Sequence, residues 1–351
     1  MKKERILIFN ISTDSNNTSL GFAINWLNQL SEYYIEVDVV TLNKGATDML
    51  NDNINVYCHD SVNTNKITKF IALRKIIKNL LKNNEYRFCL SHMTTSLILV
   101  SSTISRFHNL QSILWYTHKG PTTFIKKIVL YLGALFSDRI ITASENSFPL
   151  KFKKVTSIGH AINYEDFYRS SVNTESKDFL ILSRISRSKN IEESILGFLN
   201  SVYGESQSIT IVGGPLTKQD ADYESYLKSK YSEYPNIRFA GSVPHPNLST
   251  YIGKTGFHIN NTPKGFYDKS VLETLSGGII NFYINSEYDK NIHPEYLKIL
   301  KFDGTKDDLT KSINIISELE KDSLMEIIQF SQEKVKEESL KTLHHRILKV
   351  I

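Results

Sequence analysis

The sequence predicts an α/β protein built from two doubly wound domains, and three observations predict this fold class. Short apolar or β-branched runs alternate with longer helical patterns along the whole chain. Some twelve such runs occur, which is more than one twisted sheet usually holds. The chain has 351 residues, of which 40% are hydrophobic, enough to bury two cores. The alternation calls for parallel sheets covered by helices on both faces.

The candidate strands divide evenly between the two halves of the chain. Those in the first half are Arg5–Phe9, Glu36–Leu42, Arg87–Leu90, Ser112–Tyr116, Arg139–Thr142 and Val155–Ile158. Those in the second half are Phe179–Leu182, Ser208–Val212, Ile237–Phe239, Gly256–Ile259, Gly278–Ile284 and Lys298–Phe302. Helical patterns include Ile191–Leu199, Lys218–Lys230 and the tail from Lys321 to Ile351.

A polar stretch without apolar periodicity, Asn163–Lys177, indicates the linker between the domains. The predicted domains are therefore residues 1–163 and 164–330. Residues 331–351 form a C-terminal helix that can cross back to the first domain. We expect the two domains to face each other across a cleft, with the carboxyl ends of their strands pointing inward, where such folds bind ligands.

One segment makes the protein basic. The net charge is +5, whereas residues 66–87 alone contain seven basic side chains and one acid. Their pattern predicts an amphipathic helix, in which Lys75, Lys78 and Lys82 share a face. The opposite, apolar positions are Phe70, Leu73, Ile77, Leu80 and Leu81.

Two interpretations of this helix stay open. It can press on an anionic membrane surface, or it is an ordinary surface helix whose apolar side is core. Nucleic acid is a poorer partner, because no aromatic side chains interleave with the charges as stacking platforms.

Cysteine usage and hydropathy indicate the compartment. The two cysteines, Cys58 and Cys89, lie in or beside candidate strands without metal-ligand spacing, which favours buried thiols in a reducing environment. No apolar signal region precedes the first strand, and no apolar run is long enough to span a bilayer. We expect a cytoplasmic protein, soluble or peripheral at the inner face of the membrane.

The segment from Asn261 to Gly278 predicts a loop that leads into a short helix. Pro263 and Gly265 break regular structure, and Asp268 or Ser270 can cap the helix. The free N–H groups of the first turn favour an anion, and Glu273 follows one turn later, placed to accept hydrogen bonds from a diol. The alternative is a glycine-bounded helix with one exposed acid, which many α/β proteins contain.

Further polar and glycine positions follow other candidate strands. Arg184 and Lys189 follow strand Phe179–Leu182 near the start of a helix, and two cations there suit a pyrophosphate. Surface salt bridging is the alternative for this pair. Gly213 and Gly214 form a turn where backbone can approach a ligand closely.

Two further turns complete the set. Gly241, Val243 and Pro244 follow the next strand and offer backbone groups to the edge of a flat base. His118 follows strand Ser112–Tyr116, so it would project into the cleft from the first domain. It is either a structural or a catalytic histidine.

Taken in chain order, these motifs resemble the retaining GT-B glycosyltransferases of glycosyltransferase family 4, also called glycosyl transferases group 1. The resemblance covers most of residues 110–290 and is most specific in the second domain. It implies that Arg184 and Lys189 hold the donor diphosphate, that Glu273 binds the ribose, and that the Gly241–Pro244 turn receives the base. The catalytic residues implied are His118, Arg184 and Lys189. The donor-binding residues implied are Arg184, Lys189, Gly213, Gly214, Gly241, Val243, Pro244, Lys269, Ser270, Val271 and Glu273.

The sequence departs from the family pattern in two places. The family usually has an acid eight positions before the ribose-binding Glu, where this chain has Gly265. Asp268 and Lys269 instead resemble a Gly-x-x-Asp-Lys-x-x-x-Glu variant found among bacterial surface-polysaccharide enzymes, in which Lys269 could add charge or Asp268 could cap the helix. The loop from Asn10 to Gly21, usually glycine-rich, has Gly21 alone.

The resemblance implies a hexosyl-type transfer from a nucleotide-diphosphate sugar to an acceptor hydroxyl with retention of configuration. The expected acceptor is a glycan or a lipid-linked molecule of surface polysaccharide or lipopolysaccharide assembly. We expect no metal and no cofactor, because the cations and helix amides can stabilise the leaving group and the only Asp-x-Asp, Asp220–Asp222, looks like a solvated helix face. The alternatives are a nucleotide-sugar epimerase on the same fold and a non-catalytic nucleotide-sugar-binding scaffold of a glycan-assembly complex.

Overall fold

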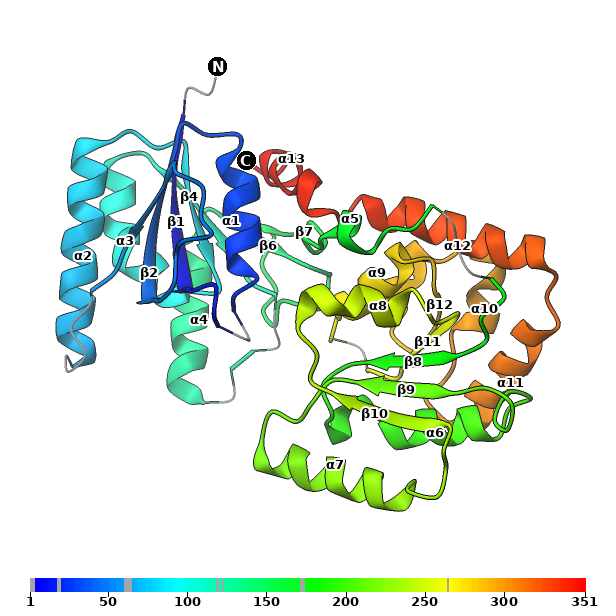
Figure 1. The fold of residues 1–351 in the computed structure, drawn as a ribbon. Coiled ribbons are helices and arrows are strands. Elements are labelled where there is room, and N and C mark those ends of the chain that lie inside the picture. The colour runs from blue at the N-terminus through cyan, green and yellow to red at the C-terminus, as the bar shows by residue number, and fades with distance from the viewer. Residues whose placement is uncertain are drawn as a thin grey trace. The chain divides into compact units, whose positions relative to one another are not determined.

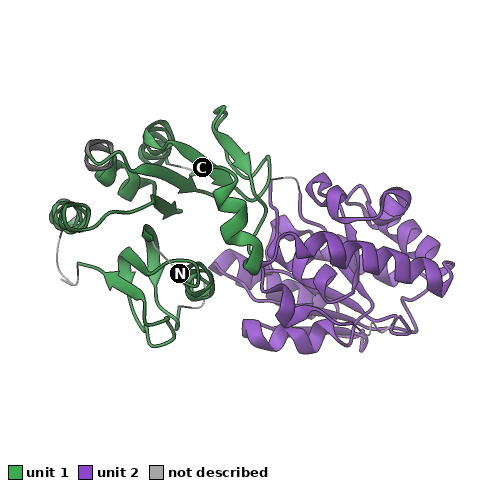
Figure 2. Ribbon diagram, turned by 90° about the horizontal axis from the view of Figure 1, so that it is seen from above, with its two compact units in different colours: residues 1–161, 340–351 green, residues 162–339 purple. Residues whose placement is uncertain are grey.

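The chain forms two compact units, which Figure 2 shows in different colours. Unit 1 comprises Met1–Ala161 and Leu340–Ile351, and unit 2 comprises Ile162–Ser339. The computed structural model describes residues 4–17, 20–59, 65–117, 120–121, 123–170, 174–263 and 265–351.

Within the described residues, unit 1 contains a seven-stranded parallel sheet in the order β3-β2-β1-β4-β5-β6-β7 (Figure 1). Its strands are β1 (Arg5–Thr13), β2 (Glu36–Lys44), β3 (Ile54–Tyr57), β4 (Phe88–His92), β5 (Gln111–Trp115), β6 (Arg139–Thr142) and β7 (Val155–Ser157). Its helices are α1 (Ala23–Ser31), α2 (Lys66–Asn83), α3 (Thr95–Phe107), α4 (Phe124–Phe136), the 3₁₀ turn η5 (Leu340–Thr342) and α13 (Leu343–Leu348).

Both faces of the unit 1 sheet are covered, as strands that are apolar on both sides require. Alternate residues of β1 point to opposite faces. Ile6 and Ile8 pack in one core cluster with α1 and α13, whereas Leu7 and Phe9 pack in another with α2 and α3. The C-terminal segment therefore belongs to the core of unit 1, through Leu343 and Ile347 among others.

Unit 2 contains, over its described residues, a five-stranded parallel sheet in the order β10-β9-β8-β11-β12. Its strands are β8 (Phe179–Leu182), β9 (Ile209–Val212), β10 (Ile237–Gly241), β11 (Phe257–Asn260) and β12 (Ile280–Tyr283). Its α-helices are α5 (Tyr164–Phe167), α6 (Ile191–Leu199), α7 (Lys218–Lys230), α8 (Leu248–Ile252), α9 (Lys269–Ser276), α10 (Leu297–Leu300), α11 (Lys306–Ser317) and α12 (Lys321–Lys336). Its 3₁₀ turns are η1 (Arg187–Lys189), η2 (His245–Asn247), η3 (Ser286–Asn291) and η4 (Pro294–Tyr296). Figure 1 shows α8 and α9 on one side of this sheet and α6 and α7 on the other.

The predicted α/β class with two doubly wound sheets is confirmed, whereas one strand prediction is wrong and one strand was missed. Lys298–Phe302 is not a strand: the chain forms α10 there, and only Lys301 makes an isolated bridge, with Tyr283. A short apolar run cannot by itself separate a buried strand from a buried helical turn. The prediction also missed β3, an edge strand whose residues are all only partly buried, so that it lacks a clear apolar pattern.

The predicted amphipathic helix at the basic segment is confirmed as α2. Leu73, Ile77, Leu80 and Leu81 are buried in the core of unit 1, whereas Phe70 is 44% exposed. Lys75, Lys78 and Lys82 are exposed. The apolar stripe is thus mainly core, which leaves the exposed lysines as the part of α2 that is open to a partner.

The two thiols differ in exposure. Cys89 is buried in β4, as predicted, whereas Cys58 directly after β3 is only partly buried. None of the described helices is long and apolar enough to cross a membrane.

Candidate functional site

The candidate site lies at the point in unit 2 where the strand order changes direction. β9 and β10 extend the sheet from one side of β8, and β11 and β12 extend it from the other. The loops after β8 and β11 therefore diverge, and open parallel sheets bind ligands in the crevice left at such a place. The β8 loop carries Arg184 and Lys189, and the β11 loop leads to α9.

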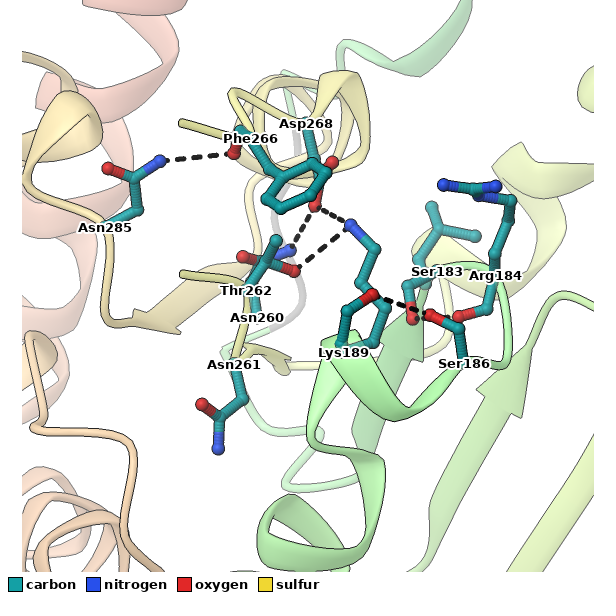
Figure 3. Close-up of polar contacts among 12 residues, drawn as sticks. Ser183, Arg184, Ser186, Lys189, Asn260, Asn261, Thr262, Phe266, Asp268 and Asn285 are labelled. Carbon is teal, nitrogen blue, oxygen red and sulfur yellow. Dashed lines mark hydrogen bonds and ion pairs between the residues drawn. The ribbon is translucent and has the colours of Figure 1, made fainter. Parts of the chain in front are cut away.

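Lys189 is held at this point by three residues of the segment between β11 and α9. The side chain is 6% exposed. Its Nζ lies 2.6 Å from Oδ2 of Asp268 and donates to Oγ1 of Thr262 at 3.3 Å, as Figure 3 shows. The ammonium also lies 5.3 Å from the centre of the Phe266 ring. An ammonium has three donors, so one N–H remains beyond these two hydrogen bonds.

Asp268 occupies the N-cap position of α9, but its carboxylate does not cap the helix. It accepts hydrogen bonds from Lys189 and, at 3.3 Å, from Nδ2 of Asn260. The backbone N–H of Asp268 donates to the Tyr288 hydroxyl at 2.5 Å. The expectation that Asp268 could cap the helix is therefore wrong, because the carboxylate is directed at Lys189 instead.

The first turn of α9 consequently keeps unpaired amides. Helix geometry leaves the first N–H groups without intrahelical partners. Among the described residues, the N–H groups of Ser270 and Val271 have no hydrogen-bond partner. The α9 dipole places partial positive charge at this end, so the turn can accept an anion.

Arg184 lies on the same loop as Lys189 and is exposed. Within the described part of the chain, its guanidinium makes no hydrogen bond or ion pair. Its charge acts on Asp220, whose pKa is lowered first by the Thr217 hydroxyl and to a smaller extent by Arg184. Arg184 is thus a cation beside the switch point that remains available to a ligand.

The three predicted glycines hold neighbouring loops together. Gly213 has a φ of +139°, and a Cβ there would lie 1.9 Å from the carbonyl oxygen of Ser183. Its N–H donates to the carbonyl of Gly241 at 2.9 Å, and the Gly214 carbonyl accepts from Ile185 at 3.0 Å. Gly213 therefore has a packing reason to lack a side chain, which is separate from any contact with a ligand.

Glu273 is paired with a histidine that the sequence-based prediction did not select. Glu273 is 5% exposed, and its Oε1 lies 3.0 Å from Nε2 of His245. His245 is in η2, directly after the turn that contains Val243 and Pro244, and its ring meets Phe167 edge-on at 5.4 Å. A cavity of about 320 Å³ adjoins the pair, lined by Asp166, Phe167, His245, Pro246 and Ser249. The sequence feature that could have identified His245 is its position immediately after a predicted strand and turn.

The pair also changes the titration of His245. The hydrogen bond to Glu273 raises the pKa of His245 above its ordinary 6.5, and the burial of the ring opposes this rise. Lys269, the first residue of α9, is partly buried. Burial lowers the pKa of Lys269, and the charge of Glu273 opposes that change.

The His245–Glu273 pair should make stability depend on pH. Because the folded-state pKa of His245 is raised from 6.5, its stabilisation is complete below that value and is lost as the pH rises through the raised pKa. We expect the loss of unfolding free energy in His245→Asn to be larger at pH about 6 than at pH about 9. The imidazole is 48% exposed, so the difference should stay below about 1 kcal/mol. Urea titrations at the two pH values measure it, and equal losses would contradict the charge effect.

The predictions for His118 and for the Asp-x-Asp pair remain to be compared with the structure. His118 lies outside the described residues, so its predicted role stays a prediction. Asp220 forms a capping box with Thr217 at the start of α7, so this member of the Asp-x-Asp pair has a structural role rather than the merely solvated one expected. In the described ranges, no three His, Cys, Asp or Glu side chains gather as a metal site would require.

Unit 1 has its own switch point, between β1 and β4. His92 ends β4 and is buried between Trp26 and Trp115, with ring centres 5.1 and 4.9 Å away. Its Nδ1 lies 3.5 Å from Oδ1 of Asn10 at the end of the apolar part of β1. The sequence-based prediction missed His92, although it follows a predicted strand by two positions.

Comparison with known proteins agrees with this architecture. Residues 15–144 match the model of a family described as Glycosyl transferase 4-like. No curated protein sequence matches the chain significantly.

Several solved structures share the fold over almost the whole chain. HepE of Anabaena, in complex with UDP and glucose, has a TM-score of 0.72 at 13% identity, and the match covers 99% of both chains. Sucrose-phosphate synthase from Thermosynechococcus elongatus has a TM-score of 0.71 at 13% identity, covering 99% of this chain and 98% of that one. The lipopolysaccharide outer core galactosyltransferase WaaB has a TM-score of 0.68 at 11% identity, covering 99% and 100%. The fold is therefore GT-B, and residues 15–144 of this chain are similar to the Glycosyl transferase 4-like family.

Proposed function

We propose that this protein is a retaining, metal-independent glycosyltransferase that moves a hexose from a nucleotide-diphosphate sugar to an acceptor hydroxyl in bacterial surface polysaccharide or glycolipid assembly. The observation that carries the proposal is the position of Lys189, fixed by Asp268 and Thr262 next to the unpaired amides of α9. Glu273 lies one turn further along the same helix.

In this proposal the donor diphosphate binds between the β8 loop and the first turn of α9. Lys189 would give its third N–H to a phosphate oxygen, and Arg184 would contribute a second cation from the loop. The amides of Ser270 and Val271 would complete the cradle. Departure of the nucleoside diphosphate adds negative charge, and groups already in place stabilise it without reorganisation.

The nucleoside would lie along α9 and the β10 turn. Glu273 would accept hydrogen bonds from the ribose hydroxyls, while His245 holds one of its oxygens and fixes the carboxylate in position. The backbone from Gly241 to Pro244, with Val243, would receive the base. Lys269 would add charge near the phosphates, and His118 would lie against the donor sugar.

The proposed donor and pathway draw on the structures that share the fold. HepE is recorded with UDP and glucose, and WaaB is named as a galactosyltransferase of the lipopolysaccharide outer core. We therefore propose a uridine-diphosphate hexose as the first donor to test. A glycan or lipid-linked acceptor fits a cytoplasmic enzyme that contacts the inner face of the membrane, where Lys75, Lys78 and Lys82 of α2 would attract anionic lipid.

A thermal-shift screen against UDP, GDP, ADP and CMP sugars tests the donor site. A ligand present at 100 times its dissociation constant stabilises the native state by about 2.7 kcal/mol. We expect one nucleotide class to raise the melting temperature, and Arg184→Ala to remove most of the rise. Arg187→Ala is the matched control, because Arg187 is a nearby cation engaged with the Tyr223 ring at 4.9 Å.

Four outcomes would contradict the proposal. Absence of a shift with every nucleotide sugar would remove the donor site, and equal losses in both arginine variants would remove the role of Arg184. Conversion of the donor sugar in the absence of any acceptor would identify an epimerase instead. Binding without turnover of any acceptor would favour the non-catalytic scaffold.

A further inference from the structure

Helix α4 of unit 1 exposes a row of large apolar side chains to solvent. Phe124, Ile128, Tyr131 and Leu135 recur at a spacing that places them on one face, and Ile125 lies beside this row. Their exposures are Phe124 76%, Ile125 74%, Ile128 43%, Tyr131 50% and Leu135 48%. We call these five residues the α4 stripe.

The α4 stripe is distinct from the face by which the helix packs on its own unit. Leu130 and Ala134 are buried in a core cluster with Ile98 of α3. Gly133 lies so close to α3 that a Cβ would come within 2.9 Å of Thr95 Cβ. The helix therefore has two apolar faces, and only one of them is needed for the fold.

Basic residues lie near the stripe, and the exposed acid at its end, Asp138, accepts hydrogen bonds from Ser112. Lys126 and Lys127 are the only charged residues of α4, and both are exposed. The Tyr131 and Phe152 rings lie 5.9 Å apart, which brings the exposed Lys151 and Lys153 alongside the helix. Lys127, Lys151 and Lys153 therefore add positive charge beside the apolar stripe, whereas Lys126 lies two positions after Phe124, on the opposite face of the helix.

Neighbouring α2 adds further groups of both kinds. α2 and α4 both pack against α3, and Figure 1 shows the three helices in one layer beside the sheet. Helices that follow parallel strands begin at the same edge of the sheet. The exposed Ile67, Phe70 and Ile71 at the start of α2 therefore lie at the same edge as Phe124 and Ile125.

We propose that the α4 stripe is a docking surface for an anionic lipid bilayer. A helix of 13 residues is about 20 Å long, too short to span a membrane but suited to lie in its plane. The apolar side chains would enter the boundary between headgroups and acyl chains, and the lysines would contact anionic headgroups. Charge complementarity favours lipid over an apolar protein partner, because the described cations beside the stripe outnumber the exposed acid at its end, Asp138, whose Oδ2 already accepts hydrogen bonds from Ser112.

Vesicle flotation with the full chain tests this surface independently of the transferase activity, since it needs neither donor nor acceptor. We expect the protein to float with phosphatidylglycerol-containing vesicles and to stay behind with pure phosphatidylcholine. The double variant Phe124→Ser, Ile125→Ser should reduce the bound fraction by about tenfold. The double variant Lys126→Gln, Lys127→Gln should lose the part of binding that depends on salt concentration.

The control is Leu216→Ser, which removes a side chain of similar exposure, 64%, from unit 2. It should bind vesicles like the wild type. All three variants change exposed residues, and their melting temperatures verify that they fold.

Three results would overturn the proposal. The first is absence of flotation by the wild type, and the second is flotation of the Phe124, Ile125 variant equal to that of the wild type. The third is a wild-type dimer in light scattering that the same variant converts to monomer, because the stripe would then be an interface between copies.

Discussion

Replacing Lys189 with alanine is expected to lower kcat/KM by about two to three orders of magnitude, the usual cost of removing one preorganised charge-stabilising donor. Under the proposed function, Lys189 neutralises charge that develops on the departing diphosphate. The nucleotide-induced rise in melting temperature should fall as well, because the same ammonium contacts the ground-state phosphates. Transfer assays with the best donor from the thermal-shift screen measure the first effect.

Asp268→Asn distinguishes ligand binding by Lys189 from a structural ion pair. Lys189 and Asp268 have exposures of only 6% and 21%, and breaking a buried pair costs about 3–5 kcal/mol. Both variants should therefore lose stability, Asp268→Asn less than the alanine variant because the amide oxygen still accepts a hydrogen bond. Only Lys189→Ala should lose nucleotide binding. Equal nucleotide shifts in the two variants would show that Lys189 acts solely within the fold.

Replacing Gly213 with alanine should destabilise unit 2 by about 2–4 kcal/mol, a large effect for one methyl group. The methyl group would lie 1.9 Å from the Ser183 carbonyl, in a backbone with a φ of +139°. The variant must therefore move the β8 loop, which carries Arg184. Gly241→Ala is the matched control: its φ is +71°, but a Cβ there meets nothing within 4 Å. The expected cost of this control is about 1 kcal/mol.

The measurement must report on unit 2. The two tryptophans, Trp26 and Trp115, both lie in unit 1, so tryptophan fluorescence is insensitive to unit 2. Urea unfolding followed by far-ultraviolet circular dichroism covers both units. Equal midpoints for Gly213→Ala and Gly241→Ala would contradict the steric argument.

The sequence could place the candidate residues at strand ends because parallel α/β folds bring those ends to one edge. The loops that carry Arg184, Gly213 and Gly241, and the loop that leads into the helix of Glu273, were found in this way. The contact of Lys189 with Asp268 spans 79 positions of the chain, and no local pattern encodes it. The local preference of Asp for N-cap positions pointed to capping, but the buried ammonium attracts the carboxylate more strongly.

Other errors came from patterns that are ambiguous in themselves. Lys298–Phe302 has buried apolar residues at Leu300 and Phe302, a spacing that suits a strand or a helical turn. His245 has no periodic signal at all, since it acts through a partner in a distant helix. The α4 segment is almost wholly apolar, so its sequence does not show which face of the helix is exposed to solvent.

The route of the chain has a consequence for biosynthesis. Unit 2 begins and ends at paired residues, Ile162 and Ser339, which form a parallel bridge. Its whole sequence therefore leaves the ribosome before the twelve residues that complete unit 1. Since domains tend to fold as they emerge, the N-terminal sheet should wait with Trp26 and Leu30 uncovered until Leu343 and Ile347 arrive. A released fragment that ends at residue 339 should accordingly contain a finished second unit and a first unit that still binds chaperones.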